Sequence, residues 1–96
     1  MDEEDQAILW PSEDKYPAFV AVCEGGVLQT YAEFEAVARP MLDEMVARGL
    51  KVATVDPDLD QMVSWCRANF GNVKSSARAA YAAMVVLEQD AKSTRH

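Results

Sequence analysis

The sequence predicts an α+β fold: a small two-layer domain in which a short antiparallel sheet, a hairpin plus one further strand, is packed by a long kinked helix and a C-terminal helical hairpin. Three observations predict it. Short apolar runs that end in turn residues precede residue 30, an amphipathic helical stretch follows, and the chain from Pro57 onward has helical periodicity with one interruption. With 96 residues and no repeat or linker-like run, we expect a single domain, 1–96, with a frayed acidic N-terminus at 1–6 and a polar tail at 91–96.

The predicted strands are short apolar runs. Residues 18–23 are rich in Val and Phe, and the Glu24-Gly25-Gly26 turn that follows would let 27–29 pair back as a hairpin arm, because glycine adopts positive φ at little cost. Residues 50–55 carry β-branched side chains and predict the further strand. The run 7–10, stopped by Pro11, is either another strand or an irregular segment.

The first long helix is predicted to begin at a capping box, in which the Thr30 hydroxyl accepts from the Glu33 amide and the Glu33 carboxylate accepts from the Thr30 amide. Gly49 is the expected terminator, and Pro40 predicts a kink or a break. The predicted apolar face comprises Tyr31, Phe34, Val37, Ala38, Met41, Leu42, Met45 and Val46.

Two further helices are predicted after residue 56. Asp56 as cap and Pro57 in the first turn indicate the start of one, and the second begins at Ser75 or Ser76. The predicted apolar faces are Leu59, Met62, Val63, Cys66 and Phe70 in the first helix, and Ala77, Ala80, Tyr81, Met84, Val85 and Leu87 in the second. The carboxylates at 56, 58 and 60 lack the glycine and the glutamate of a calcium loop, so we expect no metal site.

Charge and composition limit the classes of function that fit this chain. The chain has 16 acidic and 9 basic residues, a formal charge of −7, and residues 1–50 alone hold eleven acids and three bases. Such a field disfavours nucleic acid and favours a basic protein surface. No apolar run is long enough to span a bilayer and the first residues are acidic, so we expect a cytoplasmic protein without membrane contact, with Cys23 and Cys66 as reduced thiols.

Nothing in the sequence predicts an enzyme. The only histidine is His96, so no cysteine or serine has a histidine base near it in the chain, and no phosphate-loop lysine follows Gly25-Gly26. We therefore expect no catalytic residue, no metal and no cofactor.

One segment carries a resemblance. Ser64-Trp65-Cys66-Arg67-Ala68-Asn69, followed by 77–83, resembles a stretch found in small proteins of bacterial plasmids, phages and integrative elements. Small acidic proteins of such elements resemble, as a class, the anti-CRISPR proteins and related inhibitors of host defence, which have no common fold. The resemblance implies a stoichiometric inhibitor in the cytoplasm of a bacterial host cell.

The leading hypothesis is a non-enzymatic protein-binding module whose acidic face contacts the basic, nucleic-acid-binding surface of a host nucleoprotein complex. Two alternatives stay open. One is a helix-turn-helix-like DNA-binding regulator that uses Lys74, Ser75, Ser76 and Arg78; the other is a structural or oligomerisation protein, including a homodimer. The predicted partner-binding residues are the acids Glu13, Asp14, Glu24, Glu33, Glu35, Asp43 and Glu44 and the apolar anchors Tyr16, Tyr31 and Trp10.

Overall fold

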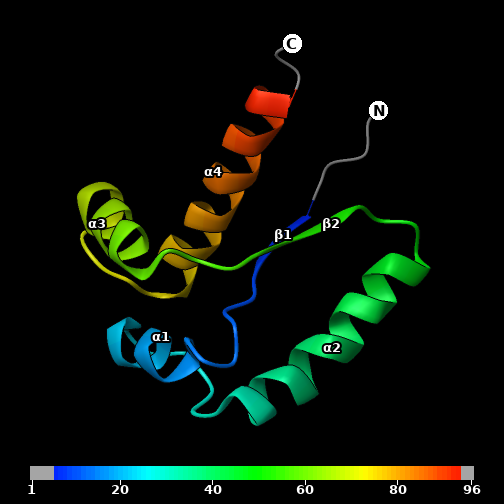
Figure 1. Ribbon diagram of the computed structural model, residues 1–96, viewed down its shortest axis with the longest axis horizontal. Coiled ribbons are helices and arrows are strands. Elements are labelled where there is room, and N and C mark those ends of the chain that lie inside the picture. The colour runs from blue at the N-terminus through cyan, green and yellow to red at the C-terminus, as the bar shows by residue number, and fades with distance from the viewer. Residues whose placement is uncertain (1–5, 94–96) are drawn as a thin grey trace.

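The structure, a computed structural model, describes residues 6–93 and has an α+β architecture. The elements in chain order are β1 (Gln6–Leu9), α1 (Tyr16–Val22), α2 (Tyr31–Ala47), β2 (Val52–Val55), α3 (Leu59–Phe70) and α4 (Ser75–Ser93). The two strands form a central ribbon, with α3 and α4 on one side of it and α1 and α2 on the other (Figure 1). The α+β class is therefore as predicted, whereas the sheet is different.

The sheet consists of β1 and β2 alone among the described residues, and the strands are parallel. Gln6 is paired with Val52 and Leu9 with Val55, and the ladder is extended by a hydrogen bond from the Trp10 amide to the Val55 carbonyl at 2.7 Å. A parallel pair needs a long crossover, which α1 and α2 provide. The prediction of an antiparallel hairpin plus one strand was wrong, although the runs near 7–10 and 50–55 do form strands.

The hairpin is absent because residues 18–23 are largely helical. Pro17 lies in the first turn of α1, where its missing N–H costs nothing, and the buried rings of Tyr16 and Phe19 are three residues apart on one side of the helix. Residues 27–29, the predicted second arm, form no strand. The Tyr16 hydroxyl holds them instead by donating to the Leu28 carbonyl at 2.8 Å.

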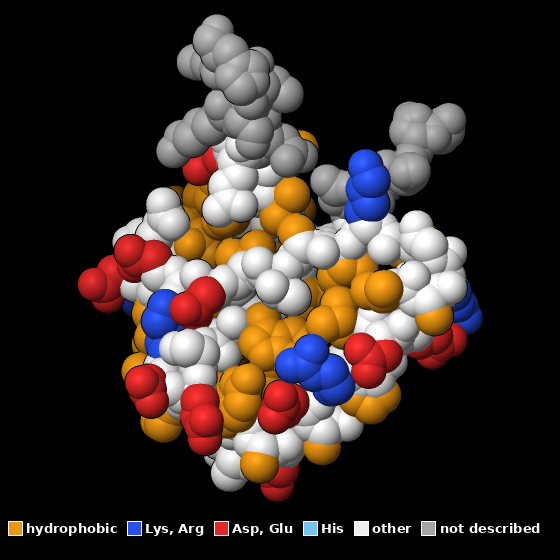
Figure 2. Space-filling view, turned by 45° about the vertical axis from the view of Figure 1, so that its right-hand side comes forward, with side chains coloured by type: hydrophobic (Ala, Val, Ile, Leu, Met, Phe, Trp, Pro, Cys, Tyr) orange, Lys and Arg blue, Asp and Glu red, His pale blue; other side chains and the backbone are white. Residues whose placement is uncertain are grey.

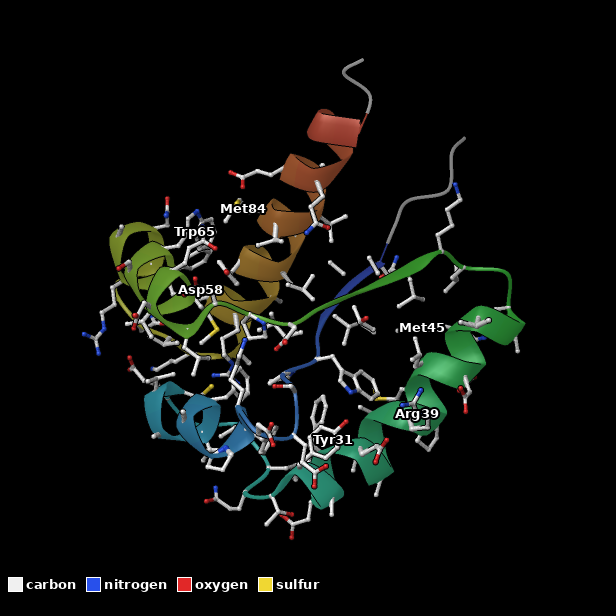
Figure 3. All side chains as sticks on the ribbon, in the orientation of Figure 1. Tyr31, Arg39, Met45, Asp58, Trp65 and Met84 are labelled. Atoms are coloured by element: carbon white, nitrogen blue, oxygen red, sulfur yellow. The ribbon has the colours of Figure 1, made fainter. Side chains whose placement is uncertain are left out.

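Helix α2 confirms the predicted capping box and ends before Gly49, which has a φ of 86°. Pro40 lies inside the helix, and the helix continues through it without a break. The start of α3 differs slightly from the prediction. Asp58, labelled in Figure 3, is the cap that accepts from the Gln61 amide, while Asp56 accepts from the Ser12 amide and pairs with Lys15 at 3.2 Å.

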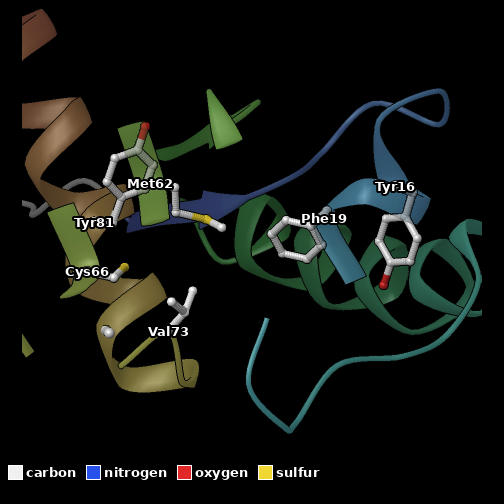
Figure 4. Packing of buried hydrophobic residues seen from close by; sticks show 7 residues of the cluster. Tyr16, Phe19, Met62, Cys66, Val73 and Tyr81 are labelled. Atoms are coloured by element: carbon white, nitrogen blue, oxygen red, sulfur yellow. The ribbon is translucent and has the colours of Figure 1, made fainter. Parts of the chain in front are cut away.

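Two groups of buried side chains hold the elements together. Helix α4 packs on the strands through Ala82 and Val86, next to Val55. Thus Val86 is buried while Leu87, assigned to the apolar face by the sequence, is 68% exposed. The larger group joins α1, α3, α4 and the turn before α4, and contains Tyr16, Phe19, Met62, Cys66, Val73, Ala77 and Tyr81 (Figure 4).

The predicted chain ends overlap the described residues only in part. Gln6, assigned to the frayed start, is the first residue of β1, and the predicted tail is helical as far as Ser93. Residues 1–5 and 94–96 lie outside the described residues. Within 6–93, no helix combines the length and the apolar character needed to cross a membrane.

Candidate functional site

Helix α2 contacts β2 and is joined to the rest of the protein by an aromatic cluster at its first turns. The rings of Trp10 and Phe34 meet edge to face with centroids 5.0 Å apart, and the Tyr16 ring lies 5.4 Å from that of Phe34. The Trp10 indole N–H donates to the Tyr31 hydroxyl at 3.2 Å. These contacts fix the start of α2 against β1 and α1.

Arg39 closes the exposed side of this cluster. Its guanidinium carbon lies 4.9 Å from the centroid of the Trp10 ring, a cation–π contact, and its Nη2 donates to Glu35 at 3.3 Å. Tyr31 and Arg39 come from the same helix, about two turns apart (Figure 3). The side chains of Trp10 and Tyr31 are therefore half-buried and already engaged, and Tyr16, only 1% exposed, belongs to the core. Tyr16 thus offers no surface to a partner.

Part of the apolar side of α2 does not pack against the rest of the protein. No residue of the helix is buried, and Val37 and Met41 remain 54% and 51% exposed. Glu33, Val37, Met41 and Glu44 follow one another at intervals of four, four and three residues, which places them along one side of the helix. We call this row the α2 surface.

The α2 surface has an apolar centre between acidic ends. A shallow hollow of about 200 Å³ lies at its C-terminal end and is lined by Met41, Glu44, Met45 and Arg48. Figure 2 shows one face of the molecule, on which acidic and basic side chains lie among exposed hydrophobic ones. An apolar centre with a charged rim is the arrangement found in protein interfaces.

The predicted acids do not form one patch. Glu33 is held by the capping box and Glu44 pairs with Arg48 at 2.9 Å. Asp43, next to Glu44 in sequence, points to a different side of α2. Glu13 and Asp14 precede α1 and are exposed without a hydrogen bond or ion pair to another described side chain.

Glu24 has a structural role. Its carboxylate accepts from the Val73 amide at 3.0 Å, and its own amide donates to the Val73 carbonyl at 3.0 Å. The turn after α1 is thereby joined to the turn before α4. Nothing in the sequence connected these two positions, which are 49 residues apart.

Arg78, assigned to a DNA-reading helix in one alternative, is buried. It is 7% exposed, and its guanidinium donates to the Val73 carbonyl at 2.7 Å and to the Gly25 carbonyl at 3.3 Å. Lys74, Ser75 and Ser76 are exposed at the start of α4. A signal for the burial was present, because Arg78 precedes Ala82 and Val86 at intervals of four and so falls on their side of the helix.

Four side chains of the core have raised pKa values. Burial raises the pKa of the Tyr16 and Tyr81 phenols above 10.0 and of the Cys23 and Cys66 thiols above 9.0. The Arg78 charge opposes this effect at Tyr16, Cys23 and Cys66. Both cysteines are free thiols. Across residues 6–93, no three His, Cys, Asp or Glu side chains gather closely enough to hold a metal ion.

Comparison with known proteins gives no relative. No protein-family model matches this chain, and neither a curated protein nor a solved structure is significantly similar to it. Its function must be inferred from its own residues.

Proposed function

We propose that this protein is a non-enzymatic protein-binding module that uses the α2 surface to contact a basic surface of another protein. The observation that carries the proposal is that α2, a helix of 17 residues, buries none of them, while Val37 and Met41 stay more than half exposed between Glu33 and Glu44. An apolar pair left in water on a stable helix is typical of a contact region.

Charge defines the partner. Residues 31–47 carry four acids and one arginine, so the helix presents negative charge around its apolar centre. Acids at the rim accelerate association with a basic surface, and the apolar pair supplies the affinity that rim charges do not. The partner that fits is a protein with basic residues around an apolar depression.

Small acidic proteins of mobile elements, which this chain resembles as a class, extend the proposal to a host defence nucleoprotein complex. There the module would occupy the basic surface that normally binds nucleic acid. The charge of −7 supports this choice of partner over DNA itself.

The test uses the full chain as bait in lysates of one bacterial strain with and without such a defence complex. The captured protein is purified, and its affinity is measured for the wild type and for a Val37→Ser, Met41→Ser variant. We expect the double variant to bind at least about tenfold more weakly. Leu87→Ser is the control, because Leu87 is even more exposed than these residues but lies on α4.

Charge reversal separates the contribution of the acidic residues from that of the apolar pair. Glu33 caps α2, so Glu44→Lys, at the other end of the α2 surface, is the better variant, and Asp60→Lys on α3 is its control. We expect Glu44→Lys to slow association and to reduce its salt dependence, with Asp60→Lys close to wild type. A partner whose affinity is unchanged by the Val37, Met41 double variant would refute the α2 surface as the contact. Salt-dependent binding to duplex DNA, or a stable homodimer without a partner, would favour the alternatives.

A further inference from the structure

A second concave region, lined by residues other than those of the α2 surface, lies between β1, α1, Phe34 of α2, the segment after Gly26 and the start of α4. It encloses about 310 Å³ and is mainly apolar. Leu9, Phe19, Val27 and Phe34 are among the apolar residues that line it, and Ser75, Arg78 and Ala79 line it on the α4 side. A volume of this size lies at the lower end of the range for small-molecule sites.

The charge of Arg78 is not balanced within the described chain. Its guanidinium is nine-tenths buried, yet no carboxylate among residues 6–89 lies within ion-pair distance of it. Among the residues whose side chains are described, its hydrogen-bond acceptors are all backbone carbonyls: those of Val73, Gly25 and Gly26. Burying a charge without a counter-ion is costly, so a bound anion would be strongly favoured here.

The two terminal nitrogens of Arg78 are held unequally. Nη1 donates to the Val73 carbonyl at 2.7 Å, a short bond that fixes the side chain. Nη2 reaches the Gly25 and Gly26 carbonyls at 3.3 and 3.4 Å, near the limit of a hydrogen bond. A carboxylate could therefore take over Nη2 while Nη1 keeps the guanidinium in place, and charge-assisted bonds of this kind are the stronger ones.

The start of α4 adds to the same positive potential. Ser75, the first residue of this 19-residue helix, also lines the hollow, and the unpaired amides of a helix N-terminus favour an anion.

We propose that this hollow is a binding site for a small apolar monocarboxylate, whose carboxylate pairs with Arg78 and whose hydrocarbon or aromatic body lies against Leu9, Phe19, Val27 and Phe34. The charge of Arg78 accounts for the carboxylate of the ligand, and the apolar lining accounts for its hydrocarbon or aromatic body. The inference does not depend on the α2 surface, because the two regions use different residues.

In the first experiment the full chain is titrated with sodium octanoate. Binding is monitored through the backbone amide chemical shifts in NMR spectra and through the melting temperature. We expect saturable shifts at Gly26, Val27, Arg78 and Ala79 and a higher melting temperature, because the ligand binds only the folded state. Sodium acetate controls for the anion and 1-octanol for the hydrocarbon. The proposal is overturned if octanoate gives no saturable shift up to about 10 mM, which corresponds to binding too weak for a specific site. It is equally overturned if octanol binds as well as octanoate, since Arg78 would then contribute nothing.

Two variants locate the site. Ala79→Leu fills the hollow at an exposed helical position and should weaken octanoate binding at least about tenfold. Ala83→Leu, also exposed on α4 but outside the lining, should bind as the wild type does. Wild-type affinity in Ala79→Leu would contradict the assignment. Arg78→Lys keeps the positive charge and Arg78→Gln keeps only hydrogen-bond donors, so their octanoate affinities separate the two contributions of Arg78. If these buried substitutions prevent folding, the octanoate affinity of Ala79→Leu alone decides whether the hollow is the binding site.

Discussion

Glu24 and Val73 bind each other twice, through a carboxylate-to-amide and an amide-to-carbonyl hydrogen bond, both 3.0 Å long. Val73 is fully buried in the folded protein, and its amide is bonded to the Glu24 carboxylate. The pair joins the turns that hold Arg78 in place. The same Val73 carbonyl accepts from Arg78, which makes this contact a support for the hollow described above.

Glu24→Ala should therefore destabilise the protein by about 1 to 3 kcal/mol, the cost of leaving a buried donor unpaired. Urea unfolding measures it. Glu24→Gln keeps an acceptor at the same place and should lose less, and Glu13→Ala, at an exposed acid without such a bond, should stay within about 0.5 kcal/mol of wild type. Equal losses for Glu24→Ala and Glu13→Ala would contradict this role.

Stability should fall at alkaline pH. Burial raises the pKa of Tyr16 and Tyr81 above 10.0 and of Cys23 and Cys66 above 9.0, so the unfolded chain loses these protons first. The free energy of unfolding should be constant below about pH 8 and decrease as the pH rises through 9.0 and 10.0, until the folded groups ionise as well. Urea unfolding between about pH 7 and pH 11 gives the slope.

Tyr81→Phe removes one of these titrating groups. The free energy of unfolding of this variant should therefore decrease less steeply above pH 10 than that of the wild type, whatever the change in stability at neutral pH. Phe70→Leu, which changes an exposed side chain without a titratable group, should keep the wild-type slope. A stability that stays level up to about pH 11 would show that the phenols and thiols ionise equally in both states.

The two thiols should differ in reactivity. Cys66 is fully buried and Cys23 half-buried, and burial raises the pKa of both. Because the thiolate is the reactive form, a thiol reagent should modify Cys23 first and Cys66 only when the protein opens. Mass spectrometry after timed alkylation distinguishes them, and Cys23→Ala should leave only the slow reaction. Modification of Cys66 at the rate of Cys23 would be inconsistent with the packing.

Pro40→Ala should stabilise α2. Proline inside a helix removes one hydrogen bond and costs up to about 3 kcal/mol relative to alanine, and Pro40 is exposed, so the substitution creates no cavity. We expect a gain of about 1 to 3 kcal/mol by urea unfolding and slower amide exchange in the turn around residue 40. Ala36→Pro, one turn earlier, should do the opposite. No change with Pro40→Ala would mean that α2 is not part of the cooperative fold.

The sequence was informative where local chemistry decides the structure. Thr30 and Glu33 are three residues apart and complete a capping box by themselves, so the start of α2 could be predicted. Residues 18–23 could not be assigned in this way, since a short apolar run fits a strand or one side of a helix. Tyr16, Phe19 and Val20 have helical spacing, but that pattern is visible only when Tyr16 is counted with the run.

Long-range contacts explain what the sequence did not predict about the candidate sites. The exposure of Val37 and Met41 depends on how little of α2 reaches β2, and the burial of Arg78 depends on the carbonyls of Gly25 and Gly26. The spacing of Arg78 with Ala82 and Val86 indicates which side of α4 it lies on, but neither its carbonyl partners nor the exposure of Val37 and Met41 leaves a local pattern. The acids were correctly expected to lie on the surface, but their distribution over several sides of the molecule follows from the path of the chain.

The parallel pairing of β1 and β2 has a kinetic consequence. Gln6 and Val52 are 46 positions apart, so the ladder closes a long loop, whereas the antiparallel hairpin expected from the sequence would have closed a short one. Pairs so distant form late in folding, after local helices such as α2 and α3. We expect Thr54→Gly, at an exposed position of β2, to accelerate unfolding and leave the refolding rate nearly unchanged in stopped-flow measurements. The strand pair would then determine how long the native state lasts rather than how quickly it is reached.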